Sequence, residues 1–458
     1  NIMEFLSIPF SCTLILAFIL YYIKENKDWQ RFVLLATSVV FVGFYHWQYL
    51  VSAIGITILT FYMGKWIHKS LGTKKAPYLL TLGISMLVGI WLYTRYCIDL
   101  FPLGISFYTF QAISYLIETY WEEEPEDDIF DFSVYMLLFM KFLSGPIERG
   151  YDFLPQVKEA RKFDYENIVR GMLTVAWGAF LKLMIADKIS PSVDSVMNDV
   201  HAATNVQLFV GTLLYPIQLY ADFAGYTLMA LGFGRMFGFK LSPNFDRPFS
   251  SLTTGELWRR WHQSLSFWVR DYVFMTLSAS LRRLKEWGVY ISLLVTFVVI
   301  GVWHGAGWAF AIYGLIQGLL IMWERFTEKP RAAIQKKVPS ALFKTVMVVR
   351  TYFFFALSLL FFRIVDVDKV MYVYTHAFNL TNANIKDLKL GLADQEWLVF
   401  AVAVVIMFLL DHFNAKKDLI TSLRNTSPIW RWVIYFAIII AIFRFGSFGV
   451  ENFIYVQF

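Results

Sequence analysis

Long hydrophobic runs alternate with short polar stretches along almost the whole chain. A helix needs roughly 20 mostly apolar residues to cross a hydrocarbon core about 30 Å thick. The pattern therefore predicts an all-α, polytopic membrane protein with about eleven membrane segments, some of them re-entrant. The apolar stretches cover residues 8–23, 32–50, 52–67, 78–93, 101–120, 131–143, 169–185, 208–239, 289–323, 345–362, 397–410 and 429–443.

The run 289–323 has an unusual length. Its 35 residues would span roughly 50 Å as one helix, too long for one crossing and barely enough for two. Basic residues, which favour the cytoplasm, flank it on both sides: Arg282, Arg283 and Lys285 before it, and Arg325, Lys329 and Arg331 after it. We therefore expect a segment that enters the membrane and returns to the same side.

His304 lies in the middle of this run and is followed by Gly305-Ala306-Gly307. An ionisable side chain inside a membrane costs desolvation energy and is a functional hypothesis by default. The small residues after it allow the backbone to bend. The alternative is a structural histidine satisfied by one neighbour. Inside a membrane and beside this break, the sequence favours function.

A second pattern follows Thr253, which forms a capping-box spacing with Glu256. It predicts one amphipathic helix through about Leu281. One face is apolar: Trp258, Trp261, Leu265, Trp268, Tyr272 and Met275. The other is polar: Arg259, His262, Ser266 and Arg270. Such a helix either lies in the membrane interface or presents its polar face to a water-filled cavity. A cavity that brings His262 towards His304 would favour the second interpretation.

Charged residues elsewhere divide into two kinds. Asp222 interrupts the apolar run 208–239, where a carboxylate is either paired or faces a wet cavity. The stretch 122–128 holds six acidic residues in seven and is predicted to be a solvated loop.

Composition agrees with a membrane protein: 57% of the residues are hydrophobic, 17% are charged and the mean hydropathy is +0.52. The net charge of +6 comes from basic residues in short loops, as the positive-inside rule requires, so we expect no nucleic-acid partner. The same alternation predicts an amino terminus outside the cell. Cys12 and Cys97 match no metal or redox motif, and no metal site is expected.

Several motifs occur in a fixed order within residues 102–363. They are Ser144-Gly145-Pro146-Ile147, residues 220–226, Asn244-Phe245-Asp246-Arg247-Pro248-Phe249, residues 258–266 and Trp303-His304-Gly305-Ala306. Together they resemble the bacterial membrane-bound O-acyltransferase (MBOAT) family. The resemblance implies a helical fold with a central funnel or tunnel and a catalytic core at 101–365. Transmembrane helices at 1–100 and 366–458 complete one integral membrane domain.

Two branches of the family compete. Residues 223–226, 244–249 and 266–274 resemble the D-alanyl transfer protein of teichoic acid synthesis. Residues 104–111, 153–156, 236–239 and the closing Phe453-Ile454-Tyr455-Val456-Gln457-Phe458 are similar to the membrane subunits of alginate and peptidoglycan O-acetyltransferases. Acetyl transfer in the export of a cell-surface polysaccharide is therefore the first hypothesis, and D-alanyl transfer is the alternative.

The resemblance also implies roles for particular residues. His304 corresponds to the family's intramembrane catalytic histidine, and His262 is expected to assist it by orienting or relaying. The substrate- and tunnel-lining candidates are Trp303, Asp222, Asn244, Arg259, Arg260 and Ser144. Neutral imidazole can take the proton of an attacking hydroxyl, and the imidazolium can protonate the leaving thiolate.

The same resemblance indicates the partners. The chain would bind no cofactor tightly and would use an acyl thioester donor, acetyl-CoA or an acyl carrier protein, as substrate. Membrane lipid, a cytoplasmic carrier protein and an extracytoplasmic, esterase-like acyltransferase are the expected partners, and the bacterial cytoplasmic (inner) membrane is the expected location. A polysaccharide or lipid-linked transporter is the alternative of another class. It would more often show repeated halves, and the sequence shows no such repeat.

Overall fold

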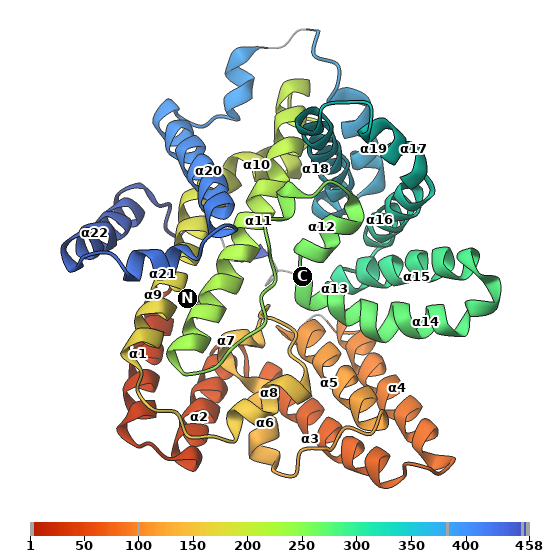
Figure 1. Cartoon of the computed structure of the whole chain (residues 1–458), viewed down its shortest axis with the longest axis vertical. Helices are drawn as coiled ribbons and strands as arrows, with labels where there is room; N and C mark the ends of the chain where they lie inside the picture. Colours follow the sequence, from red (N-terminus) through yellow and green to blue (C-terminus); the bar gives the residue numbers. More distant parts are fainter. Residues whose placement is uncertain (1–3, 99–100, 382–383, 450–452, 455–458) are drawn as a thin grey trace. The chain divides into compact units, whose positions relative to one another are not determined.

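The computed structural model describes residues 4–98, 101–381, 384–449 and 453–454. Within these ranges helices are the only regular elements, and a few of them are short 3-10 or π segments (Figure 1). The predicted all-α fold class is therefore confirmed. Residues 455–458, which complete the closing motif named above, lie outside the described residues.

The chain forms two compact units that do not follow its order. The first unit contains the residues up to Trp177 and Tyr226–Pro243, and the second contains Gly178–Gly225 and Asn244–Ile454. Helices α9 (Tyr165–Phe180) and α11 (Asn205–Met236) contribute residues to both units. The predicted division into 1–100, 101–365 and 366–458 follows the chain order and stays a prediction.

The remaining helices of the first unit are α1 (Ile8–Ile23), α2 (Lys27–Tyr45), α3 (Trp47–Lys69), α4 (Lys75–Tyr96), α5 (Ile105–Tyr120), α6 (Ile129–Leu137), α7 (Phe139–Phe142) and α8 (Gly150–Val157). The second unit begins with η1 (Leu181–Ala186), α10 (Asp187–Asn198), η2 (Pro248–Ser250), α12 (Thr254–Arg260), α13 (Gln263–Val269), η3 (Arg270–Phe274), α14 (Met275–Ser280) and η4 (Arg282–Leu284). It continues with α15 (Glu286–His304), α16 (Trp308–Phe326), α17 (Glu328–Gln335), α18 (Ser340–Ile364), α19 (Val367–His376), η5 (Ile385–Lys389), α20 (Asp394–Asn414), α21 (Leu419–Arg424) and α22 (Pro428–Phe445).

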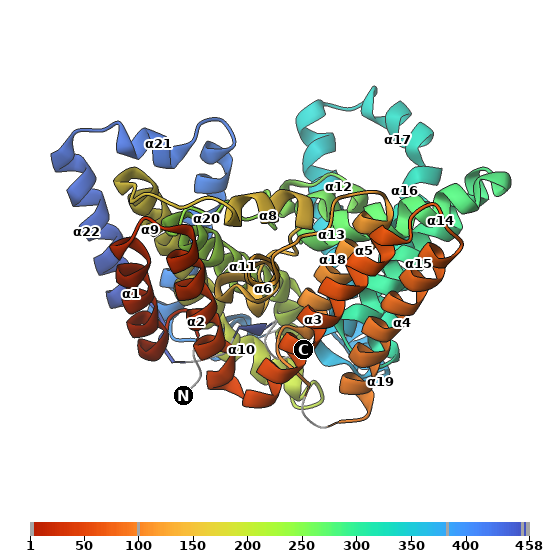
Figure 2. The same ribbon diagram turned by 90° about the horizontal axis from the view of Figure 1, so that it is seen from below.

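Seven helical stretches of the described chain are long and apolar enough to cross a membrane. They are α3, α4, the continuous stretch Tyr165–Asn198, α15, α18, α20 and α22, and α1 is a shorter apolar helix. Their length and composition agree with the multi-pass membrane protein predicted from the hydrophobic pattern. Figure 2 shows α17 and α21 at its top, on one side of the second unit.

The run 289–323 folds as the predicted hairpin: α15 and α16 are joined by a short turn and pack along their length. Two glycines allow this close approach. A Cβ atom on Gly301 would lie 2.1 Å from the Phe310 carbonyl oxygen, and one on Gly314 would lie 2.1 Å from the Phe297 carbonyl oxygen. Both positions therefore require glycine. The side of the membrane from which the hairpin enters stays a prediction.

The single amphipathic helix predicted over 254–281 is wrong. The α-helix ends at Arg260, restarts at Gln263 and passes into a π segment at Arg270. His262, which was placed on the polar face, has no exposed surface, because the break turns its side chain into the core. The apolar stripe is otherwise buried as far as Tyr272, whereas Met275 is exposed.

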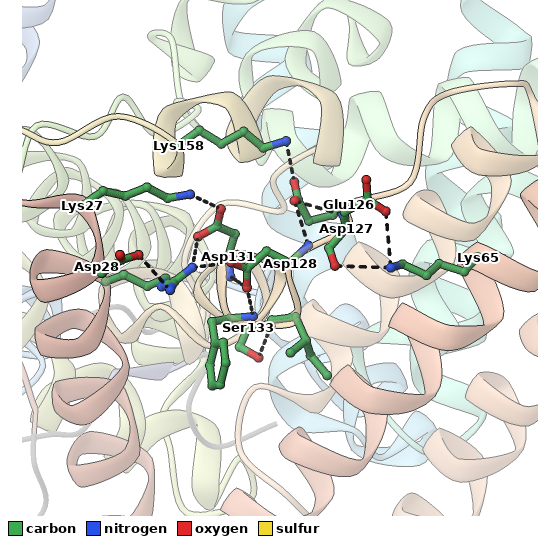
Figure 3. Close-up of polar contacts among 12 residues, drawn as sticks. Lys27, Asp28, Lys65, Glu126, Asp127, Asp128, Asp131, Ser133 and Lys158 are labelled. Atoms are coloured by element: carbon green, nitrogen blue, oxygen red, sulfur yellow. Dashed lines mark hydrogen bonds and ion pairs between the residues drawn. The ribbon is translucent and has the colours of Figure 1, made fainter.

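The acidic stretch 122–128 is less solvated than predicted. Glu126 is buried and pairs with Lys158 at 3.0 Å, while its Oε1 accepts the Asp127 and Asp128 N–H groups (Figure 3). Just beyond the stretch, Asp131 is fully buried and pairs with Lys27 and Arg31 at 2.8 and 3.0 Å. The acids of this loop thus tie α2, α6 and α8 together, and the solvated-loop prediction fails for Glu126.

Asp128 shows how the loop carboxylates are held. Burial raises the pKa of Asp128, but the Phe130 N–H and the Arg31 guanidinium lower it by more, so the net pKa lies below its usual value. The same carboxylate caps α6 by accepting the Phe130 N–H at 2.7 Å. The charged form of Asp128 is therefore the one that the folded loop stabilises.

Candidate active site

His304 is the last residue of α15, where the helix stops because small residues follow. Gly305 is extended and Gly307 has φ +117°, a value that side chains rarely adopt, so the chain turns here and α16 starts at Trp308. His304 is buried, with 5% of its surface exposed. The Gly-Ala-Gly break thus places an imidazole at the tip of the hairpin rather than within a continuous helix.

His262 lies at the other break, between α12 and α13. Its backbone is left-handed, with φ 46° and ψ 52°. A non-glycine residue in this conformation typically costs about 1–3 kcal/mol and persists only where the surroundings enforce it. Asn244 supplies much of that restraint, because its carbonyl accepts the Gln263 N–H at 2.9 Å, and its Oδ1 accepts the Ser264 N–H at 3.1 Å and the Ser264 hydroxyl at 2.6 Å.

The two imidazole rings are neighbours. Their centroids are 6.1 Å apart, and the Trp303 ring lies 5.8 Å from that of His262. Further aromatic rings surround the pair: Phe223 at 4.7 Å from His262, and Phe362 and Tyr313 at 5.2 and 6.4 Å from His304. The structure thus brings together three of the predicted site residues, His304, His262 and Trp303, in a buried aromatic environment.

The segment that carries His262 is anchored at its start. The buried carboxylate of Glu324, near the end of α16, accepts the Thr254 N–H at 2.8 and 2.9 Å and the Thr254 hydroxyl at 3.0 Å. Arg350 of α18 pairs with the same carboxylate at 2.7 Å. An acid at a helix N-terminus with several donors is a stable arrangement. It fixes α12 against α16 and α18.

A second polar contact lies one turn along the same helix. The Trp258 Nε1–H donates to Gln317 Oε1 at 3.0 Å, and the Gln317 amide donates to Ser358 Oγ at 2.6 Å. Gln317 and Ser358 are fully buried. This chain of hydrogen bonds therefore orients α12, and with it the break at His262.

Asp222 is paired rather than isolated. Lys182 Nζ lies 2.6 Å from Asp222 Oδ1 and 2.8 Å from Asp187 Oδ1, and all three side chains are at most 5% exposed. The backbone N–H of Ile454 donates to Asp222 Oδ2 at 2.7 Å, and Lys182 lies 4.5 Å from the centroid of the Phe453 ring. The Asp222 carboxylate is thus paired, which is the first of the two alternatives that the sequence left open, and its role as a tunnel-lining residue stays a prediction.

The other predicted tunnel residues have different surroundings. Arg259 is exposed, whereas Arg260 pairs with Glu256 at 3.0 Å and with Asp246 at 3.3 Å. Ser144 belongs to the first unit, is fully buried and donates its backbone N–H to the Tyr226 hydroxyl at 3.4 Å. Their roles, like that of Asn244 as a tunnel-lining residue, stay predictions.

Sequence reasoning missed several buried polar residues of the second unit. Lys182 could have been found as a lysine within the apolar stretch 179–186. Glu324 could not have been found, because its partners come from two distant segments. Tyr215 and Tyr313 look like ordinary core aromatics in the sequence.

Comparisons with known proteins show the family to which the chain belongs. The sequence model of MBOAT, the membrane-bound O-acyltransferase family, matches residues 126–366, more than half of the chain. A probable alginate O-acetylase AlgI of Azotobacter vinelandii is 29% identical over 87% of this chain and 83% of its own length. The peptidoglycan O-acetyltransferase of Helicobacter pylori is 28% identical over 78% and 75%, and the teichoic acid D-alanyltransferase of Bacillus subtilis is 33% identical over 55% and 66%.

Proposed function

Because the chain belongs to the membrane-bound O-acyltransferase family and is a multi-pass O-acyltransferase, we propose that it moves an acetyl group across the membrane for O-acetylation of an exported cell-surface polysaccharide. The observation that carries the proposal is the buried pair His304 and His262, with ring centroids 6.1 Å apart within an aromatic environment. Similarity to two kinds of polysaccharide O-acetyltransferase supports acetyl as the group transferred.

His304 is the proposed general base. Its neutral imidazole takes the proton of the acceptor hydroxyl as the oxygen attacks the acyl carbon of the thioester. The tetrahedral intermediate then breaks its carbon–sulfur bond, and the imidazolium returns the proton to the leaving thiolate. The surrounding rings of Trp303, Tyr313 and Phe362 exclude water, which limits hydrolysis of the thioester. His262 has a supporting role and orients the reacting groups.

The thioester donor, acetyl-CoA or an acyl carrier protein, would come from the cytoplasm and the hydroxyl from the outside. Neither molecule then has to cross the membrane, because the base lies between them. An extracytoplasmic partner would complete the transfer to the polysaccharide. The proposed location is the bacterial inner membrane, with the amino terminus outside.

This direction of transfer requires the basic ends of the hairpin to be cytoplasmic. Single cysteines at Arg283 and Lys337 should both be labelled by an impermeant maleimide only from the cytoplasmic side, in inverted but not in right-side-out vesicles. Labelling of the two positions from opposite sides would contradict a hairpin that enters and returns.

D-alanyl transfer towards teichoic acid is the second candidate. It is favoured by 33% identity to the Bacillus subtilis D-alanyltransferase, although this similarity covers 55% of the chain, against 87% for the alginate O-acetylase of Azotobacter vinelandii. Both functions use the same base and differ in the acyl group. Purified protein offered acetyl-CoA and a D-alanyl carrier protein in parallel would distinguish them by which thioester is consumed.

The test of the function is the thioester cleavage and acyl transfer of purified protein. The His304→Ala variant should insert normally and lose about 10²–10⁴-fold in rate, the usual contribution of a positioned base. His412→Ala is the matched control, because this histidine is exposed on α20, and its rate should equal that of the wild type. A stable His304→Ala protein with wild-type transfer would refute the proposal.

A further inference from the structure

A groove opens on the second unit between α16, α18 and α19 (Figure 1). Its volume is about 320 Å³. Its apolar lining includes Ile316 and Leu320 of α16, Leu357 of α18 and Phe378 after α19. The groove therefore presents hydrocarbon surface from three helices to whatever fills it.

The groove lies where the protein should meet the interior of the bilayer. Ile316 and Leu320 are eight and twelve positions after the first residue of α16, near its middle. Helix α18, which carries Leu357, is long and apolar enough to cross a membrane. Next to the lining residues, Leu315 and Leu319 are 39% and 41% exposed. Since the hairpin is the membrane segment predicted from the run 289–323, these exposed leucines face lipid chains rather than water.

The polar groups of the lining are already used within the protein. The Ser358 hydroxyl donates to the Phe355 carbonyl at 2.8 Å and accepts the Gln317 amide at 2.6 Å. The Tyr374 hydroxyl donates to the Leu357 carbonyl at 2.8 Å. Water in a cavity needs two to four polar partners, and this lining does not offer them. An apolar occupant is therefore the one that fits.

The size of the groove indicates which apolar occupant. One turn of an α-helix, roughly 5.4 Å long and about 10 Å across, fills roughly 420 Å³. The groove is smaller than this single turn, so a transmembrane helix of a partner does not enter it. An alkyl chain is narrow and flexible, and the bilayer supplies it. A groove left vacant would lose the dispersion contacts of its lining.

The groove is connected to the segment that carries His262. Ser358 lines it and binds Gln317, and Gln317 Oε1 accepts the Trp258 Nε1–H at 3.0 Å. Trp258 lies in α12, four positions before His262. Helices around an unfilled space partly relax into it. A shift of α16 against α18 would change the contact between Gln317 and Ser358, and with it the support of α12.

We propose that one alkyl chain of a membrane lipid occupies this groove and holds α16 and α18 at the spacing that keeps Ser358, Gln317 and Trp258 hydrogen-bonded. The bound chain thereby restrains the backbone at His262. This role goes beyond the proposed function, because neither the acyl donor nor the acceptor enters the groove. Of the measurements below, only the rate of thioester cleavage rests on that function.

The first experiment locates the chain. Purified full-length protein is placed in nanodiscs that contain phosphatidylethanolamine with a photoactivatable diazirine in one acyl chain, and the labelled residues are mapped by peptide mass spectrometry. The wild type should be labelled at the lining residues of α16 and α18. Leu320→Trp places an indole in the groove and should lose this label. Leu319→Trp is the matched control, because it changes the neighbouring exposed leucine and should keep the label.

The second experiment measures the connection to His262. Hydrogen exchange of residues 254–263 is compared in detergent after removal of lipid and after phosphatidylethanolamine is added back. Without lipid, exchange in the wild type and in Leu319→Trp should be about fivefold faster, the factor that corresponds to about 1 kcal/mol, the usual net value of one hydrogen bond. Leu320→Trp should exchange equally with and without lipid, because its indole takes the place of the chain. The rate of acetyl-CoA cleavage should follow the same order.

Two further variants keep the test decisive. Leu357→Phe fills the groove from α18 with a smaller change and should also reduce the effect of lipid, so the proposal does not depend on whether Leu320→Trp folds. Gln317→Leu removes the hydrogen bonds but not the groove. It should be labelled like the wild type and exchange fast at residues 254–263 with or without lipid.

Several results would overturn the proposal. Label spread evenly over Leu315, Leu319 and the lining residues would mean ordinary surrounding lipid only. Photo-crosslinking of benzoylphenylalanine at Leu357 to a second copy or to another protein in native membranes would assign the groove to that protein. Exchange in the wild type that does not respond to lipid would remove the connection to His262. In contrast, the expected label and exchange without any His304-dependent thioester cleavage would support this proposal and refute the proposed function.

Discussion

The ion cluster around Lys182 and the histidine site lie in the same unit and are equally buried, yet the surroundings of their polar groups differ. Lys182 has both Asp187 and Asp222 within 2.8 Å, and Asp222 also receives a backbone N–H. Around the histidines, the neighbours are mainly aromatic rings, and His262 has a left-handed backbone.

The two regions show two different reasons why a protein buries polar side chains. In the Lys182 cluster the chain satisfies its own charges, and the result is a cross-link between η1, α10 and α11. At the histidine site the backbone of His262 is strained, which lowers stability and is expected to persist where chemistry or binding requires it. Substitutions should therefore affect stability in the first region and activity in the second.

The largest effect is expected at Lys182. Replacing it by methionine leaves two buried carboxylates without their cation, which should destabilise the protein by about 3–5 kcal/mol. The measurement is the free energy of unfolding in mixed micelles. Adding Asp222→Asn to Lys182→Met should recover part of the loss, since one uncompensated charge is then gone. A Lys182→Met protein as stable as the wild type would remove the distinction between the two regions.

The next effect concerns the support of His304. Gly301→Ala places a Cβ atom 2.1 Å from the Phe310 carbonyl oxygen, so the hairpin must open, at a cost of about 1–3 kcal/mol. Gly89→Ala is the matched control, because nothing lies within 4 Å of its Cβ position on α4, and alanine there should be neutral or stabilising. Thermal unfolding compares the two, and activity should fall only in Gly301→Ala. Equal midpoints would show that α15 and α16 tolerate separation.

Much of this architecture can be predicted from the sequence, and its limits are physical. The hydrophobic period gives the long helices and the α15–α16 hairpin, because both depend on local runs and on Gly305-Ala306-Gly307. His304 is visible as a lone ionisable group within such a run. The helix break at His262 is not visible, since Asn244, 18 positions earlier, supplies the hydrogen bonds that hold it. Periodicity describes a continuous helix and cannot report a contact made by another segment.

The same limit explains Asp222 and Glu126. Whether a carboxylate faces water or a lysine depends on which helices meet, and Lys182 and Lys158 come from elements 40 and 32 positions away. A pattern of charges along one segment contains no such information. Pairing is therefore what the structure adds to the sequence.

A smaller effect is expected at His262, where conformation and chemistry can be separated. His262→Asn keeps a residue that tolerates the left-handed backbone, so the protein should fold normally, while the rate of acyl transfer should fall about tenfold, or about 1.4 kcal/mol in the barrier. His262→Val should also lose stability, because a β-branched side chain is disfavoured at φ 46°. Rates and midpoints of both variants test this. If His262→Asn lowered the rate of acyl transfer as much as His304→Ala does, His262 would be an equal partner in the chemistry.

The smallest effect is expected at a partly exposed ion pair. It tests whether paired charges also contribute to stability outside the buried core. Asp128 is 38% exposed, lies 2.5 Å from Arg31 and caps α6. Asp128→Asn keeps the cap and removes the charge, so the loss should be at most about 1 kcal/mol at neutral pH. The pKa of Asp128 is lowered in the folded state, so its charge stabilises the fold above the unfolded pKa of 3.8, and this contribution disappears as the pH falls through the folded pKa. The difference in midpoint between wild type and Asp128→Asn should therefore be constant from neutral pH down to about pH 5 and shrink below pH 3.8. A difference that grows with acid would mean that Asp128 is destabilised, not stabilised, by its surroundings.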